Sequence, residues 1–201
     1  MTSQGFLQQE IDAVVLAGGQ NTRFPTLKGF IKLGNEAILD RNLSILRECF
    51  GDCYISTNSP EVYFSRRARL IGDVIGARGP ATGILSVLLA TGAENLFVVA
   101  CDMPLVKKEL VDFIAQNQSE YDAVVAIYGG MVQPLLGLYN RRAISVIEGA
   151  IEAGRKGLVD ILGMLNVRYI AQEEFRSIDG EGESFININS PLDLKKVELV
   201  G

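Results

Sequence analysis

The chain has 201 residues, of which 48% are hydrophobic and 21% are charged, and its net charge is −5. This composition is typical of a globular protein, and we expect one domain spanning residues 1–201 with a sizeable buried core. The acidic balance argues against a nucleic-acid or membrane partner, because either would favour a basic face. No apolar run approaches the roughly 18 residues of a membrane span, and residues 1–9 lack a signal-peptide pattern. We therefore expect a cytoplasmic protein with residues 1–9 as a flexible tail.

The sequence contains no histidine and three cysteines. Without histidine, Ser-His and Cys-His triads, zinc-histidine sites and histidine acid–base catalysis are excluded. The cysteines, at positions 49, 53 and 101, have neither the number nor the spacing of a disulfide framework or a CxxC motif, so we expect plain thiols. Any enzyme chemistry must therefore use carboxylates, lysine, arginine, backbone amides and a metal ion bound through oxygen.

Apolar runs of strand length alternate with stretches of helical periodicity along the chain. In chain order, the pattern predicts a strand at 11–16, a helix at 37–49, strands at 53–56 and 70–71, a helix at 80–90, a strand at 96–101, a helix at 107–117, strands at 122–127 and 135–139, helices at 142–153 and 158–165, strands at 167–170 and 185–188, and a helix at 191–198. The strand at 135–139 is open to an antiparallel alignment. Segment 178–184 has the most loop-like internal composition.

This alternation predicts an α/β protein with a mostly parallel central sheet and helices on both faces, a three-layer α/β/α, Rossmann-like architecture. The strand at 96–101 supports it. Its residues are apolar throughout, as expected when helices cover both faces of a parallel sheet.

A glycine turn follows the first strand, in Leu16-Ala17-Gly18-Gly19. Ligands of open α/β sheets bind beyond the carboxyl ends of strands, and glycines there let backbone N–H groups approach phosphate oxygens. The sequence fits neither the GxGxxG fingerprint nor a Walker phosphate loop, and a simple tight turn remains an alternative. Two cations follow on the same loop, Arg23 and Lys28. They are candidate phosphate ligands, with solvated surface charges as the alternative.

A lone carboxylate, Asp102, follows the apolar strand at 96–101. Mg²⁺ binds through one or two carboxylates together with substrate phosphates, so Asp102 is a candidate magnesium ligand, with a turn acceptor as the alternative. Asp73 leaves its predicted strand in the same way, and by itself indicates only a turn.

Asparagines follow two further predicted strands. Asn58 comes after 53–56, where a turn residue is also expected. Asn187 and Asn189 lie two residues apart and face one side of an extended segment, although such a pair is most often turn chemistry.

Together these motifs resemble those of the molybdenum cofactor guanylyltransferases (molybdopterin-guanine dinucleotide biosynthesis protein A), a family of the nucleotidyltransferase superfamily. The resemblance covers about residues 11–197. It is carried by Leu16-Ala17-Gly18-Gly19 with Arg23 and Lys28, Ile55-Ser56-Thr57-Asn58, Gly72-Asp73, Gly79-Pro80-Ala81-Thr82-Gly83, Cys101-Asp102-Met103-Pro104, Gln133-Pro134 and Asn187-Ile188-Asn189-Ser190-Pro191. The chain departs from the family pattern at Pro25 and Leu27, where the family has glycine and an acidic residue.

The resemblance implies a nucleotidyltransferase fold and transfer of GMP from GTP to molybdopterin-bound molybdenum cofactor, with release of pyrophosphate. It implies Mg²⁺ as the metal ion, with Mn²⁺ as an alternative, and client molybdoenzymes or other cofactor-biosynthesis proteins as further partners. The implied roles are nucleotide binding for Leu16, Ala17, Gly18, Gly19, Lys28, Asn58, Asp73 and Asp102, catalysis for Arg23, Lys28 and Asp102, metal binding for Asp102, and the acceptor side for Asn187 and Asn189. Two alternatives stay open: a cytidylyltransferase on the same fold, and a non-catalytic GTP-binding module that delivers the cofactor.

Overall fold

A computed structural model of the chain describes residues 11–18, 28–190, 193–194 and 197. The flexible tail predicted for residues 1–9 lies outside these residues, as do Gly19, Arg23, Pro25 and Leu27. None of the helices in the described part of the chain is long and apolar enough to cross a bilayer.

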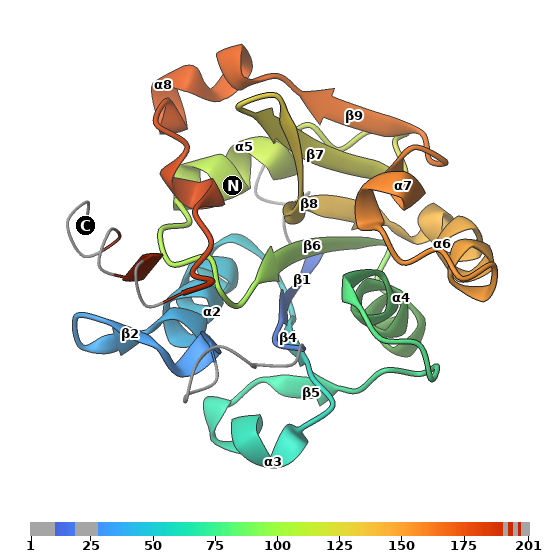
Figure 1. Ribbon diagram of the computed structural model, residues 1–201, viewed down its shortest axis with the longest axis horizontal. Helices are drawn as coiled ribbons and strands as arrows, with labels where there is room; N and C mark the ends of the chain where they lie inside the picture. Colours follow the sequence, from blue (N-terminus) through green and yellow to red (C-terminus); the bar gives the residue numbers. More distant parts are fainter. Residues whose placement is uncertain (1–10, 19–27, 191–192, 195–196, 198–201) are drawn as a thin grey trace.

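The centre of the fold is a seven-stranded sheet with the order β5-β4-β1-β6-β8-β7-β9 (Figure 1). Its strands are β1 (Ile11–Leu16), β4 (Cys53–Ser56), β5 (Arg69–Ile71), β6 (Asn95–Ala100), β7 (Ala123–Tyr128), β8 (Met131–Asn140) and β9 (Val167–Ile170). Strand β8 runs antiparallel to both neighbours, and all other pairings are parallel. The mostly parallel sheet and the antiparallel alignment considered for 135–139 are confirmed. A small antiparallel hairpin, β2 (Lys32–Leu33) and β3 (Glu36–Ala37), lies outside this sheet.

Helices cover both faces of the sheet, as Figure 1 shows. Helices α2 (Ile38–Cys49) and α5 (Lys108–Gln116) pack on one face, against Ala13, Val15, Phe97 and Val99. Helices α4 (Pro80–Thr91), α6 (Ile144–Glu152) and α7 (Leu158–Leu162) pack on the other, against the alternate residues Val14, Leu16, Leu96 and Val98. Successive strand residues face opposite sides, so a strand covered by both layers must be apolar throughout. All six residues of β6 are buried, and the predicted three-layer α/β/α class is confirmed.

Short helical elements complete the fold. They are η1 (Lys28–Phe30), α3 (Pro60–Tyr63), η2 (Phe64–Arg66), η3 (Arg141–Ala143), η4 (Gln172–Phe175), α8 (Arg176–Asp179) and η5 (Glu183–Phe185). Segment 178–184, predicted to be a loop, therefore contains the end of α8 and the start of η5.

The strand predicted at 185–188 is wrong. Phe185 closes η5, and the backbone N–H of Ile188 donates to the carbonyl of Asp102 (2.9 Å) and not to a strand. Phe185 and Ile188 are both buried, but in different clusters. Phe185 joins the cluster on the sheet face that α2 and α5 cover, and Ile188 packs with Ile31, Ile38 and Val197. Of the helix predicted at 191–198, the described residues 193, 194 and 197 are helical.

Candidate active site

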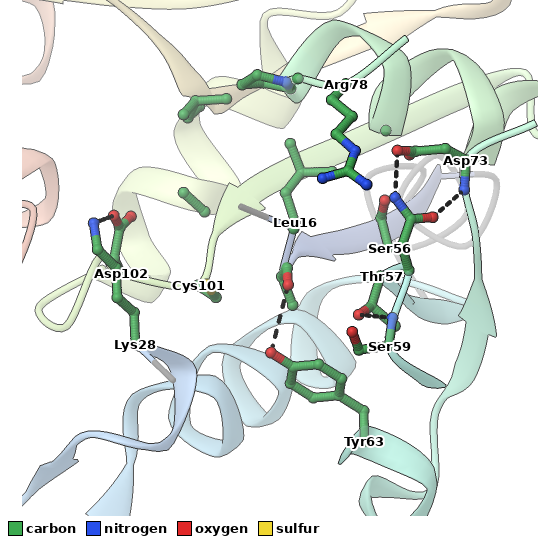
Figure 2. Close-up of a pocket in the computed structure, with 18 residues that line it drawn as sticks. Leu16, Lys28, Ser56, Thr57, Ser59, Tyr63, Asp73, Arg78, Cys101 and Asp102 are labelled. Atoms are coloured by element: carbon green, nitrogen blue, oxygen red, sulfur yellow. Dashed lines mark hydrogen bonds and ion pairs between the residues drawn. The ribbon is translucent and has the colours of Figure 1, made fainter. Parts of the chain in front are cut away.

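A cleft of about 740 Å³ opens at the carboxyl ends of β1, β4 and β6 (Figure 2). This is the edge at which open α/β sheets bind ligands. The lining residues come from the ends of β1 and β4, the turn after β6, η1 and the start of α4: Leu16, Ala17, Gly18, Ser56, Thr57, Asn58, Ala100, Cys101, Asp102, Lys28, Arg78, Gly79, Pro80 and Gly83, with Ser59, Tyr63, Asp73 and Leu135.

At one end of the cleft, Lys28 bridges two oxygen acceptors. Its Nζ lies 2.9 Å from Oδ2 of Asp102 and 2.7 Å from Oδ1 of Asn189. The side chains of Lys28 and Asp102 retain 22% and 20% exposure, so this ion pair is partly withdrawn from solvent and still open to a ligand. Figure 2 shows the side chains of Lys28 and Asp102 meeting on one side of the cleft, joined by a dashed line.

Backbone contacts set this arrangement. The amide of Asn42, buried on α2, donates to the carbonyls of Ala100 and Met103 and so fixes the turn that carries Asp102. The hydrogen bond from Ile188 N–H to the Asp102 carbonyl then draws the following residue, Asn189, to Lys28. Three segments far apart in sequence therefore present an ammonium, a carboxylate and an amide oxygen at one point.

This constellation fits a divalent cation bound jointly with substrate. Within the described residues, no group of three or more carboxylate, histidine or cysteine side chains gathers to hold a metal alone. Asp102 and Asn189 supply hard oxygen atoms, and both oxygens contact the Lys28 ammonium. The position between them therefore favours a cation. Mg²⁺ is held in this way in many phosphate-handling sites, by one carboxylate completed by phosphate oxygens and water.

At the other end, Asn58 and Asp73 form a reciprocal pair. Nδ2 of Asn58 donates to Oδ2 of Asp73 at 2.5 Å, and the backbone N–H of Asp73 donates to Oδ1 of Asn58 at 2.8 Å. The residues follow β4 and β5, so this pair joins the ends of neighbouring strands. Both side chains are thereby fixed at the cleft, and neither serves only its own turn.

The floor of the cleft depends on a close approach of α4 to β1 and β4. A Cβ atom on Gly83 would lie 2.9 Å from Oγ of Ser56, so that one of the two would have to shift, and 3.2 Å from Cδ2 of Leu16, which is a tight contact. Glycine at this position therefore lets the start of α4 reach the strand ends and form one wall.

Tyr63 buttresses the other wall and was not expected from the sequence. Its hydroxyl donates to the carbonyl of Ala17 (3.4 Å), and its ring packs on Phe30 at 5.3 Å between centroids. Arg66 also contacts Phe30, with its guanidinium carbon 4.7 Å from the centre of that ring. No local sequence signal marks Tyr63, because its role depends on a contact between segments distant in sequence.

The structure brings together most of the residues singled out from the sequence. Leu16, Ala17, Gly18, Lys28, Asn58, Asp73 and Asp102 line one cleft. Asn189 reaches it through Lys28, whereas the amide of Asn187 donates to the carbonyl of Phe185 (3.2 Å). Both asparagines are exposed, with the buried Ile188 between them. Arg23 and Gly19 lie outside the described residues.

A doubly covered sheet with a cation–carboxylate pair and a polar pair at opposite ends of one cleft is typical of open α/β proteins that bind a ligand at the carboxyl ends of their strands. Sequence comparison specifies the family. The model of the MobA-like NTP transferase domain matches residues 13–170, and the chain belongs to that family. Nucleotidyltransferases of this family use a divalent metal ion.

Individual relatives cover nearly the whole chain. A probable molybdenum cofactor guanylyltransferase from Pelotomaculum thermopropionicum is 31% identical over 93% of this chain and 91% of its own. A molybdenum cofactor guanylyltransferase from Desulfosudis oleivorans is 32% identical, with 94% of both chains covered. The crystal structure of molybdopterin-guanine dinucleotide biosynthesis protein A from Archaeoglobus fulgidus superposes with a TM-score of 0.83 at 29% identity, over 94% of this chain and 97% of that one.

Proposed function

We propose that the protein transfers GMP from GTP to molybdopterin-bound molybdenum cofactor, forming the guanine dinucleotide cofactor and pyrophosphate. The observation that carries this proposal is the Lys28–Asp102–Asn189 constellation, which faces the Asn58–Asp73 pair along one cleft. One end offers positive charge and hard oxygen atoms for phosphates and a cation, and the other offers amide and carboxylate groups for a nucleoside. The relatives named above support guanine as the base.

The chemistry needs no general base. The attacking group is an oxygen of the acceptor's phosphate monoester, which is largely dianionic near neutral pH because its second pKa is about 6. This oxygen bonds to the α-phosphorus of GTP while the bond from that phosphorus to the bridging oxygen breaks, and pyrophosphate leaves. Catalysis therefore reduces to alignment and charge neutralisation, which a chain without histidine can provide.

Each residue then has a definite task. Lys28 binds phosphate oxygens, and backbone N–H groups of the glycine turn at 16–19 approach the same phosphates. Asp102 holds the divalent ion, Mg²⁺ or Mn²⁺, which when bound supplies positive charge to the phosphates. Asn189 orients Lys28 on the side from which the acceptor enters, and Arg23 is assigned to phosphate from its sequence position.

The test is turnover with molybdopterin, Mg²⁺ and each of the four nucleoside triphosphates, with pyrophosphate and the dinucleotide product both quantified. We expect product with GTP and little with ATP, CTP or UTP, because a site built from hydrogen-bonding groups rejects bases that leave those groups unpaired. Preferential turnover of CTP would establish the cytidylyltransferase alternative. Tight GTP binding without any product would establish the non-catalytic module.

A further inference from the structure

Among the described residues that line the cleft, Arg78 is a second cation beside Lys28. It lies two residues before α4, its side chain is exposed, and Figure 2 shows its guanidinium directed into the cleft above Leu16. Among the described residues, its guanidinium makes no ion pair and no hydrogen bond that meets ordinary geometric limits. It is therefore available to a ligand.

The fold itself gains little from a cation at this place. The first turn of α4 contains no acidic residue, and its N-cap is Gly79, without a side chain to accept a hydrogen bond. A positive charge beside a helix N-terminus is disfavoured by the helix dipole. Asp73 lies on the same wall, in the segment joining β5 to α4, yet it pairs with Asn58 and not with Arg78. An arginine with a purely structural role would be expected to form an ion pair with a carboxylate on its own wall, and Arg78 does not.

The side chains of Arg78 and Asp73, on the same wall, together complement the hydrogen-bonding groups of guanine. Guanine presents N–H donors at N1 and the 2-amino group, which suit a carboxylate, and acceptors at O6 and N7, which suit a planar guanidinium. Adenine places an amino donor where guanine has O6, so adenine would oppose a donor to Arg78. The phosphate end is occupied by a different cation, Lys28, on η1.

We infer that Arg78 donates hydrogen bonds to the O6 and N7 edge of the guanine base and is a specificity-determining residue of this site. The inference rests on the proposed function, since it takes the nucleoside end of the cleft to hold guanine. The competing role for Arg78 is a contact with a phosphate group. The two roles differ in the nucleotide atom that Arg78 contacts: N7 of the base in one, a phosphate oxygen in the other.

Calorimetric titration with GTP and 7-deaza-GTP separates these roles, because 7-deaza-GTP lacks only the N7 acceptor. For the wild type we expect about five- to tenfold tighter binding of GTP, as the loss of one half of a bidentate contact predicts. Arg78→Ala should bind GTP about tenfold more weakly and should discriminate the two nucleotides less than about twofold. The change in that ratio isolates the contact between Arg78 and N7.

The control is Arg176→Ala, which removes an exposed arginine on α8 that does not line the cleft. It should keep the wild-type affinity and the wild-type ratio. If Arg78→Ala weakens GTP and 7-deaza-GTP by the same factor, Arg78 contacts phosphate or ribose and the inference is overturned. Unchanged GTP affinity in Arg78→Ala overturns it as well.

Failure of the proposed function has a different signature. It would appear in the wild type, as equal affinities for GTP, ATP and CTP or as absence of turnover. A wild type that prefers GTP, combined with an Arg78→Ala variant that keeps the full discrimination against 7-deaza-GTP, rejects the Arg78 inference alone.

Discussion

Replacing Asp102 with asparagine tests the centre of the proposed mechanism. The substitution keeps the size of the side chain and one acceptor oxygen, but removes the charge that pairs with Lys28 at 2.9 Å. We expect a folded protein whose turnover falls by at least about 10²-fold, because a neutral amide is a poor ligand for the divalent ion that neutralises the phosphates.

The magnitudes separate catalysis from stability. Exposed ion pairs contribute about 0.2–1 kcal/mol, and this pair retains 20–22% side-chain exposure, so its loss should cost about 1 kcal/mol. For a chain of this length, that corresponds to a decrease in Tm of roughly 2–4 °C. A 10²-fold loss of turnover is about 2.7 kcal/mol of transition-state stabilisation, well above the ground-state effect.

A matched control is available on α5. Asp112 pairs with Lys108 at the same Nζ–oxygen separation, 2.9 Å, away from the cleft. Asp112→Asn should produce a similar change in Tm and leave turnover unchanged. The assays are thermal melts without ligand and steady-state kinetics over a series of Mg²⁺ concentrations.

The reasoning would be refuted by near-normal turnover of Asp102→Asn with an unchanged Mg²⁺ requirement. Asp102 would then not be the metal ligand. A decrease in Tm of more than about 10 °C would instead show that Asp102 is chiefly a structural residue.

Three further predictions concern the rest of the fold. Burial acts to raise the pKa of Asp179, but hydrogen bonds, including one from Lys107, outweigh it and lower that pKa below its usual value. The ionised Asp179 therefore stabilises the folded state fully above about pH 4, and this contribution is lost as pH falls further. Asp179→Asn should flatten the decrease in Tm between about pH 5 and pH 3. Gly182→Ala should lower the free energy of unfolding, measured by urea titration, by more than about 2 kcal/mol, because φ is +65° and the new Cβ would lie 2.2 Å from the ring of Tyr128. A decrease below about 0.5 kcal/mol, which is small for a point mutation, would contradict this prediction. Burial raises the pKa of the Cys49 thiol to about 12, so a thiol reagent at pH 7.5 should label it only after denaturation, and rapid labelling of the native protein would contradict its burial.

Much of the architecture follows from local patterns in the sequence. Apolar runs of strand length, separated by helical periodicity, predict the layers because each residue's face is set by its neighbours at spacings of two or 3.6. The positions of Gly18 and Asp102 at the cleft follow from the same local information, since parallel strands end at one edge of the sheet.

The tertiary structure alone decided the contacts between distant segments. The bond from Lys28 to Asn189 joins residues 161 apart in sequence, and the Asn58–Asp73 pair depends on β4 lying beside β5. The strand predicted at 185–188 failed for the same reason. A short apolar run indicates that side chains are buried but not which group accepts the backbone hydrogen bonds, and here the turn after β6 accepts from Ile188. Local spacing determines the faces of an element, whereas its neighbours are chosen by the packing of the whole chain.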